Sequence, residues 1–496
     1  MTAYLRPGVF VEETLNPLPP ALGSNAQSVA AFIGAIDRGP VDVTAVTSWS
    51  QFTTLYGNYG ANNLVHLAVL LFFSNGGGTC YVRRTVGTGA ATATRSFNDR
   101  ATEPASTLRL SAANPGVWGN GLNVTIANSI SGVGVDVIVY KGGTTSASIV
   151  EKFTDLSMTS TDSRYLVGVI NGQSNYIVAT DLGSSATGGS RLPVTAVNQF
   201  LAGGNDGSAV TQANIGADAS AFDVVHNSLI MNAPGITDAT AVGQLITYAQ
   251  NRGDVFVIVD PIAGDVATQL VTAASYTSTS YAAVYYPQIV IKDPTSTVSG
   301  VTTLANPGGA IAGVFASTDA SRGVFKAPAG LAARIGGAVS VKSLTNSELD
   351  SMNSASAAVN AIRYIPGSGI VIMGARTLNP TYVDKYVPVR RTLMYLRKSM
   401  TDLTQFAIFE PNDEKLWRRV TAALDSFLRD FWRQGGLRGT SPAQAFFVKC
   451  DSTTNPQSSI DNGYVNIEVG VSLQRPAEFI VIKISQFDGG TTVTVA

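Results

Sequence analysis

The chain has 496 residues, of which 45% are apolar and only 14% charged, against roughly 25% charged residues in ordinary soluble domains. Its 33 Lys and Arg residues nearly balance its 34 Asp and Glu residues, and the resulting net charge of -1 argues against a polycation that coats nucleic acid. A low charge content close to neutrality favours association between protein surfaces. At roughly 150 residues per domain, the length predicts about three domains.

The apolar runs are too short to predict a membrane span. The longest, Leu64 to Phe73, contains His66 and falls far below the roughly 20 residues that a spanning helix needs, so no stable membrane insertion is expected. The first seven residues lack the features of a secretory signal, which predicts synthesis in the cytosol. The isolated thiols Cys80 and Cys450 and two distant histidines form no zinc-ligand pattern, and we predict neither metal nor cofactor.

Residues 1–22 are predicted to form an extended N-terminal arm. Its β-prone strand consists of Val9, Phe10, Val11 and Glu12. Three prolines between residues 17 and 20 then deny the chain a helix. An apolar strand cut off in this way must pair with a sheet elsewhere, unless it is only a frayed terminus.

Residues 23–88 and 205–340 are predicted to form one discontinuous α/β domain. Nearly all-apolar strands alternate with helices, which is typical of a parallel sheet buried on both faces. We expect strands at 29–34, 80–82, 229–232 and 255–260, and helices at 62–74 and 237–251. His66 lies in the first helix and is interpreted as a packed core residue. Asp260 ends a strand where α/β enzymes often keep a carboxylate, although a turn-forming Asp-Pro pair is the favoured interpretation.

Residues 89–204 interrupt the α/β pattern and are predicted to be an inserted all-β domain. The composition shifts to Ser, Thr, Gly and Asn, with short alternating runs such as 122–126 and 135–140. Strands at this spacing, separated by Gly-rich turns, indicate a β-sandwich or barrel.

No catalytic pattern stands out along the chain. The phosphate-binding P-loop pattern does not occur, and Gly367–Gly369 is not a nucleophile elbow. Carboxylate pairs meet only in the folded chain, so one alternative stays open: a hydrolase or nucleotide-binding enzyme with a concave site at Asp260.

Residues 341–486 are predicted to form a C-terminal α+β domain that carries most of the charge asymmetry. Between Arg363 and Lys449, 14 basic and 7 acidic residues give a net charge of +7, which leaves -8 for the rest of the chain. A chain divided in this way can dock its basic region against the acidic region of a second copy.

The clearest helix of this region is expected from Asp413 to Gln434, with Asn412 as its N-cap. Its apolar stripe consists of Leu416, Val420, Leu424, Phe427 and Phe431. The opposite side and its flank carry Lys415, Arg418, Arg419, Arg429 and Arg433. We interpret these five residues as charged subunit contacts, with a merely solvated face as the alternative. Because Trp417 and Trp432 lean toward the apolar stripe, the basic face lacks a stacking platform, and no direct nucleic-acid binding is expected.

Three strand-like runs follow this helix, at 445–450, 465–471 and 478–484, and their alternation predicts an antiparallel sheet with one covered face. Residues 487–496 then form a C-terminal arm, in which two glycines precede another β-prone strand. That strand consists of Thr491, Thr492, Val493, Thr494 and Val495. The chain therefore has a detachable strand predicted near each end.

Several segments together carry a family resemblance. In chain order they are Arg6–Glu13, Pro307–Gly313, Asp319–Pro328, Met373–Leu378, Phe409–Trp417, Phe431–Gly435, Ala445–Asp451, Val465–Gly470 and Arg475–Phe479. The chain resembles the contractile tail sheath proteins of bacteriophages and related contractile injection systems. The family usually has Trp where Met373 stands. Residues 89–204 match nothing specific, and the resemblance implies that they form a surface-exposed domain that varies within the family.

The resemblance implies a structural protein rather than an enzyme. Sheath proteins polymerise as stacked six-fold rings around a tail tube protein, and they contract to drive that tube through the host envelope during genome ejection. The resemblance also implies baseplate and tail terminator proteins as partners and the virion as location. It implies that the two arms join sheets in neighbouring subunits, which fits a non-closing, filament-forming contact. Another self-assembling shell or tube component of the same particle is the second alternative.

Overall fold

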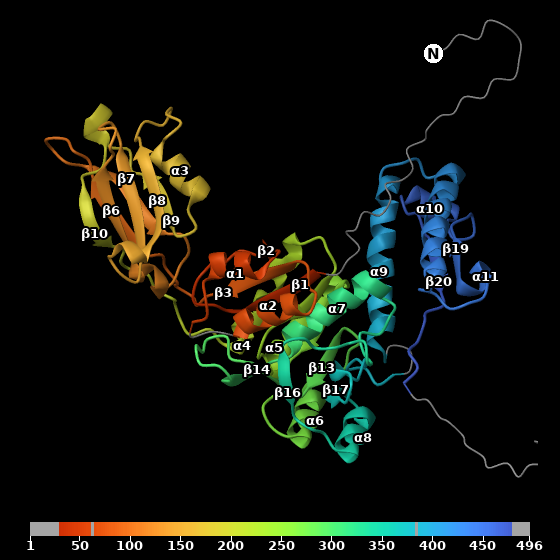
Figure 1. The fold of residues 1–496 in the computed structure, drawn as a ribbon. Coiled ribbons are helices and arrows are strands. Elements are labelled where there is room, and N and C mark those ends of the chain that lie inside the picture. Colours follow the sequence, from red (N-terminus) through yellow and green to blue (C-terminus); the bar gives the residue numbers. More distant parts are fainter. Residues whose placement is uncertain (1–28, 61–63, 382–384, 479–496) are drawn as a thin grey trace, which may run out of the picture.

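The computed structural model describes residues 29–60, 64–381 and 385–478. Figure 1 shows an inserted β region in orange and yellow, a central α/β region, and a C-terminal region in blue in which helices flank a small sheet. The predicted arm strands, Val9–Glu12 and Thr491–Val495, lie outside the described residues.

The central region is built on an eight-stranded sheet. Its order is β18 (Gly369–Ile372), β17 (Val359–Ile365), β13 (Ala282–Tyr286), β12 (Val255–Val259), β11 (Leu229–Asn232), β1 (Val29–Ala35), β3 (Cys80–Thr85) and β2 (Thr44–Val46). The six inner strands run parallel, and β18 and β2 are antiparallel at the two edges. The expected parallel α/β sheet is confirmed.

Helices cover both faces of this sheet. Successive residues of each strand point to opposite sides, and because both sets are apolar, each face packs against a layer of helices. Ala30 and Phe32 of β1 face a core with α1 (Trp49–Tyr56), α2 (Leu64–Ser74) and α7 (Gly308–Arg322). Ala31 and Ile33 face a second core with α4 (Gln212–Ala217), α5 (Ala239–Arg252), α6 (Val266–Ser275) and α8 (Asn346–Ser354). A side sheet joins β15 (Thr302–Ala305), β14 (Ile289–Lys292) and β16 (Ala338–Val341).

His66 is a core residue, as predicted. Its side chain is 1% exposed, and its ring meets Phe52 edge-on with centroids 5.0 Å apart.

The central sheet crosses the expected domain boundary at residues 340 and 341. β17 pairs with β13, and β18 pairs with β17, so both strands complete the α/β sheet rather than the C-terminal domain. The outer edge of β18 is closed by backbone bonds between residues 330–335 and Ile370 and Ile372. The expected boundary rested on a change in residue composition along the chain. Strand pairing is a long-range contact, which composition does not report. In our proposed division, the C-terminal domain therefore begins near residue 387.

The inserted region has two antiparallel sheets around one core. The first joins β4 (Thr94–Asn98), β5 (Ser106–Ala112) and β9 (Ile177–Asp181); the second joins β10 (Ala196–Phe200), β6 (Leu122–Asn128), β7 (Val135–Lys141) and β8 (Ile149–Leu156). The region is not purely β, because α3 (Leu166–Gln173) packs Leu166 and Ile170 into the same core. All buried residues of that core lie between Ala93 and Leu201, so the insertion has a hydrophobic interior of its own.

Two arginines join the inserted region to the central one. Arg84 at the end of β3 is 1% exposed, and its guanidinium donates to the carbonyls of Ile36, Asp37 and Gly39 and, across the junction, to that of Pro115 at 2.8 Å. Arg38 stacks over the rings of Trp118 and Tyr176, at 5.1 and 4.0 Å.

The C-terminal region consists of the long helices α9 (Val387–Thr404) and α10 (Glu414–Arg433), the short helices α11 (Pro442–Ala445) and α12 (Gln457–Asp461), and the strands β19 (Phe446–Lys449) and β20 (Glu468–Val471). The two strands pair antiparallel, as expected. β20 is shorter than predicted, because the backbone N–H of Asn466 instead donates to the Asn455 side chain. The third predicted strand, 478–484, lies outside the described residues from residue 479 onward.

The start and the stripe of α10 differ in detail from the prediction. Asp413 is the N-cap, because its carboxylate accepts from the backbone N–H of Leu416 at 2.8 Å. The predicted cap, Asn412, instead accepts from the indole N–H of Trp417. Leu428 is fully buried, whereas the predicted stripe residue Phe427 is half-buried at the edge.

Candidate assembly surface

The two-stranded sheet β19–β20 is incomplete within one chain. Neither strand has a second neighbour among the described residues. One face packs on α10 through Phe446, Val448 and Val469. On the other face, Phe447 is 52% exposed and its ring lies over Gly470, where a Cβ would come within 2.1 Å of the ring. A two-stranded sheet is marginal alone, and its open edges are templates for further strands.

The basic side chains of α10 are exposed, apart from the half-buried Arg429, and are mostly paired within the helix. Arg418 contacts Glu414, Arg429 contacts Asp425 and Arg433 contacts Asp430, at 3.0, 2.8 and 3.3 Å. Arg419 lies over the ring of Phe406, at 4.4 Å. Lys415 is exposed. The expected basic face is therefore a mixed one, in which three of the five cations already have a carboxylate neighbour.

Two other arginines of the basic region are buried and pair with carboxylates distant in the sequence. Arg391 of α9 binds Asp319 of α7 with both terminal nitrogens, and the two side chains are 2% and 6% exposed. Burial raises the pKa of Asp319, although Arg391 opposes this shift. Arg376, 8% exposed, binds Glu478. Part of the predicted charge complementarity between copies is thus realised inside a single chain.

The contact between Arg376 and Glu478 is bidentate. Nε of Arg376 donates to one carboxylate oxygen at 2.8 Å and Nη2 to the other at 2.5 Å, and the hydroxyl of Tyr386 donates to the second oxygen at 3.1 Å. Although burial opposes it, the hydrogen bond from Arg376 helps to hold the pKa of Glu478 below its ordinary value. Glu478 is the last residue before the C-terminal segment that lies outside the described residues.

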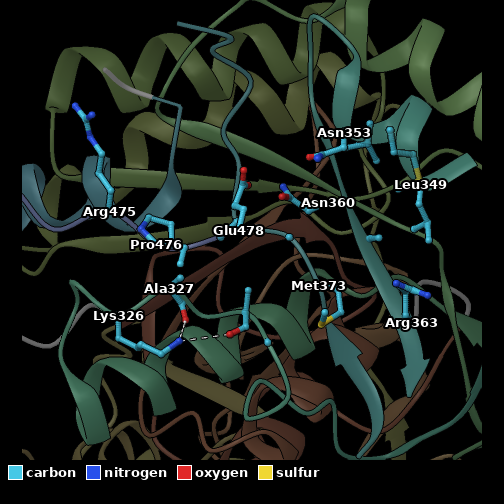
Figure 2. A pocket seen from close by; sticks show the side chains of 18 of the residues that line it. Lys326, Ala327, Leu349, Asn353, Asn360, Arg363, Met373, Arg475, Pro476 and Glu478 are labelled. Atoms are coloured by element: carbon cyan, nitrogen blue, oxygen red, sulfur yellow. Dashed lines mark hydrogen bonds between the residues drawn. The ribbon is translucent and has the colours of Figure 1, made fainter. Parts of the chain in front are cut away.

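A cavity of about 620 Å³ lies beside this contact. Figure 2 shows Pro476 and Glu478 on one side of it and Met373 and Arg363 on the other. Residues 474–478 line the cavity, together with parts of β17 and of the loop after β18. Residues 472–478, which run from the end of β20 along the cavity to Glu478, are called the strap.

Asp260 is a buried anchor between two loops. It is 1% exposed, and its two oxygens accept from the backbone N–H groups of Gly235, at 3.0 Å, and Gly308, at 2.8 Å. Burial raises its pKa to about 6, although these hydrogen bonds oppose the shift. The enzyme alternative required an accessible carboxylate at this position, which the burial of Asp260 contradicts.

Within the described ranges, no three His, Cys, Asp or Glu side chains gather in a way that could hold a metal ion. A search of the described helices finds none with the length and hydropathy that a bilayer span requires.

Comparisons with known proteins agree with the sequence resemblance. Residues 382–487 match the family described as phage tail sheath C-terminal domain. The tail sheath protein of Vibrio phage KVP40 is 28% identical over 127 residues, which cover 25% of this chain and 18% of that protein. The match thus spans about a fifth of the length of this curated relative.

Solved structures extend the likeness over nearly the whole fold. The sheath of the PVC extracellular contractile injection system, in its contracted state, has a TM-score of 0.59 at 23% identity and covers 98% of this chain and 99% of that one. The contracted helical sheath of the anti-feeding prophage has a TM-score of 0.61 at 22% identity, with 97% and 99% covered. The sheath tail protein of Listeria innocua has a TM-score of 0.61 at 14% identity, with 90% and 95% covered. The expected fold class and the family resemblance are confirmed.

Proposed function

We propose that this chain is a contractile tail sheath protein, which polymerises with itself around a tail tube and contracts to drive that tube through a host envelope; the match of residues 382–487 and the likeness of the fold to solved sheath proteins support this. The polymer consists of stacked six-fold rings in the virion, in contact with the tube, a baseplate and a tail terminator protein. The role is structural, without catalysis and without direct contact with nucleic acid.

The observation that carries this proposal is the open two-stranded sheet on α10. A strand from another copy can complete β19–β20, because backbone N–H and C=O groups at a sheet edge accept any extended segment. The predicted arm strands at Val9–Glu12 and Thr491–Val495 supply such segments. A contact in which each copy offers an arm to the next does not close on itself, so it generates a filament.

Each arm acts as a modest tether. About four backbone hydrogen bonds at roughly 0.5–1.5 kcal/mol each, with burial of Val493 and Val495 at roughly 1.5–3 kcal/mol each, contribute several kcal/mol before the cost of ordering the arm. Repeated at every subunit, such tethers keep the lattice connected while the compact domains move past each other.

The charged side chains of α10 provide a second contact in the proposal. An exposed pair spaced three or four residues along a helix contributes only about 0.3–0.5 kcal/mol. Arg418 and Arg433 can therefore exchange their intrahelical carboxylates for those of a neighbouring copy at little cost. Such exchange allows the contacts to differ between the extended and contracted lattices.

The arm is tested by electron microscopy of purified variants. Removal of residues 489–496 leaves folded monomers that no longer form tubes. Because alternate residues of a strand face opposite sides, Val493→Asp with Val495→Asp blocks assembly more strongly than the matched pair Thr492→Asp with Thr494→Asp. Normal tubes from the truncated protein would contradict the arm proposal, and closed shells from the intact protein would favour a different component of the particle.

The charged contact is tested by reversing Arg418, Arg419, Arg429 and Arg433 to Glu, which we expect to block tube formation while the monomer stays folded. The matched control reverses four exposed basic residues of the inserted region, namely Arg95, Arg109, Lys152 and Arg164. Equal loss of assembly in both variants would show a general effect of net charge rather than a contact on α10.

A further inference from the structure

We propose that the ion pair between Arg376 and Glu478 anchors the base of the C-terminal arm to the central sheet, so that load on the arm passes to the α/β domain. This inference rests on the proposed function, in which the arm links neighbouring copies. It assigns a positioning role to a contact that joins two regions of the chain 102 residues apart.

The path of the strap shows why a separate anchor is needed. After β20, the backbone N–H of Ser472 donates to Ala445, and the side chain of Gln474 donates to the carbonyl of Leu437. These contacts belong to the small C-terminal sheet and the turn after α10. Beyond them the strap leaves that sheet, passes along the cavity and reaches Arg376 at Glu478.

The backbone of Arg376 is hydrogen-bonded to the central sheet. Its backbone N–H donates to the side chain of Asn360 on β17 at 2.7 Å, and that amide in turn donates to the carbonyls of Arg376 and of Val284 on β13, at 2.8 and 3.0 Å. Its Nη1 donates to the carbonyl of Asn353 in α8 at 2.6 Å. The backbone of Arg376 is thereby tied to two strands through Asn360, and its guanidinium is held by α8 where it meets Glu478.

The middle of the strap borders open space. Residues 474–478 line a cavity of about 620 Å³, so this stretch lacks the close packing of a core segment. A pull on the arm therefore meets its first firm resistance at Glu478, where two charge-assisted bonds in a fork arrangement resist both sliding and rotation.

The length of chain beyond the anchor suits a link between copies. Residues 479–490 separate Glu478 from the predicted arm strand at Thr491. Twelve residues of extended chain span at most about 40 Å, roughly the width of a domain of this size. If the base were loose, the free length would also include the strap, and the arm would search a larger volume for its acceptor sheet. Anchoring at Glu478 raises the effective concentration of the arm at the acceptor sheet of a neighbouring copy. It also shortens the free length of chain that links two copies.

The test uses Glu478→Gln in the full-length protein, because this change keeps the shape of the side chain and removes its charge. The matched control is Glu410→Gln at an exposed loop position. We expect the Glu478→Gln monomer to stay folded, with its unfolding midpoint lowered only by the loss of this one contact. Amide exchange of residues 472–478 rises by about tenfold or more, on the scale of a lost charge-assisted hydrogen bond. The denaturant concentration that dissociates assembled tubes falls, while Glu410→Gln changes neither quantity.

A third variant, truncated after Glu478, separates this inference from the proposed function. If the truncated chain fails to form tubes but Glu478→Gln tubes resist denaturant as well as wild type, the anchor is overturned and the arm proposal stands. If the truncated chain forms normal tubes, the arm proposal fails and the anchor role of Glu478 fails with it. Unchanged amide exchange of residues 472–478 in Glu478→Gln would also overturn the anchor.

Discussion

The central sheet and the C-terminal sheet differ in how completely a single chain closes them. The eight-stranded sheet has helices on both faces, and its β18 edge is occupied by residues 330–335. The β19–β20 sheet has one covered face and, within the described residues, no further strand at either edge. A sheet that is finished within one chain stabilises the subunit, whereas an unfinished sheet leaves hydrogen-bonding groups for another copy.

The largest effect is expected at the buried ion pair between Arg391 of α9 and Asp319 of α7, a helix that covers the central sheet. Arg391→Ala leaves Asp319 without its cation in an apolar setting, which costs about 3–5 kcal/mol in the free energy of unfolding. Denaturant unfolding of the purified monomer measures this loss. Arg438→Ala, at an exposed position, serves as control and stays within about 0.5 kcal/mol of wild type.

A matched pair of core leucines separates stability from assembly. Leu428→Ala under the unfinished sheet and Leu110→Ala in the inserted region each remove a fully buried side chain, at about 2–5 kcal/mol. We expect Leu428→Ala to abolish tube formation and Leu110→Ala to leave it intact, because the inserted core is separate. Calorimetry with electron microscopy of both variants makes the comparison, and loss of tubes in Leu110→Ala would contradict it.

The pH dependence of the finished sheet reports on Asp260. Its pKa rises from an ordinary 3.8 to about 6 on folding, so the folded state binds the proton more tightly than the unfolded state. This group therefore contributes stability that is fully present below about pH 4 and is lost as pH rises to about 6, by about 3 kcal/mol in all. Subtracting the stability profile of Asp260→Asn from that of wild type isolates this contribution, and a flat difference between pH 4 and 6 would refute it.

The smallest effect on the monomer is expected at the surface of α10. Arg418→Gln with Arg433→Gln breaks two exposed pairs and changes the free energy of unfolding by less than about 0.5–1 kcal/mol. Assembly is expected to weaken all the same, and more strongly at low than at high salt, because the contact is electrostatic. Light scattering across a salt series measures the difference, and a parallel decline for wild type and variant would argue against the contact.

The arrangement of elements was largely predictable from local pattern. The strands at 229–232 and 255–259 and the helix between them follow from apolar runs and their spacing, because burial on two faces leaves a direct trace in composition. The pairing of β17 with β13, and so the place of β17 and β18 in the central sheet, was not predictable in this way. A strand can pair with any other strand of the chain, and local pattern does not show which one. The N-cap Asp413 was missed by one residue, because two adjacent side chains could fill that role and Trp417 engages the other.

The candidate assembly surface shows the same difference between local pattern, which was predictable, and long-range contacts, which were not. The sequence alone determined that this chain has an amphipathic, charged helix, short strands beside it, a β-prone run of residues near each end and an uneven distribution of charge. Only the tertiary structure decided what the charges do: Arg376 and Arg391 pair with Glu478 and Asp319, while the cations of α10 stay at the surface. The physical reason is that periodicity reports which face of an element is buried, whereas an ion pair depends on which residues the fold brings within about 4 Å.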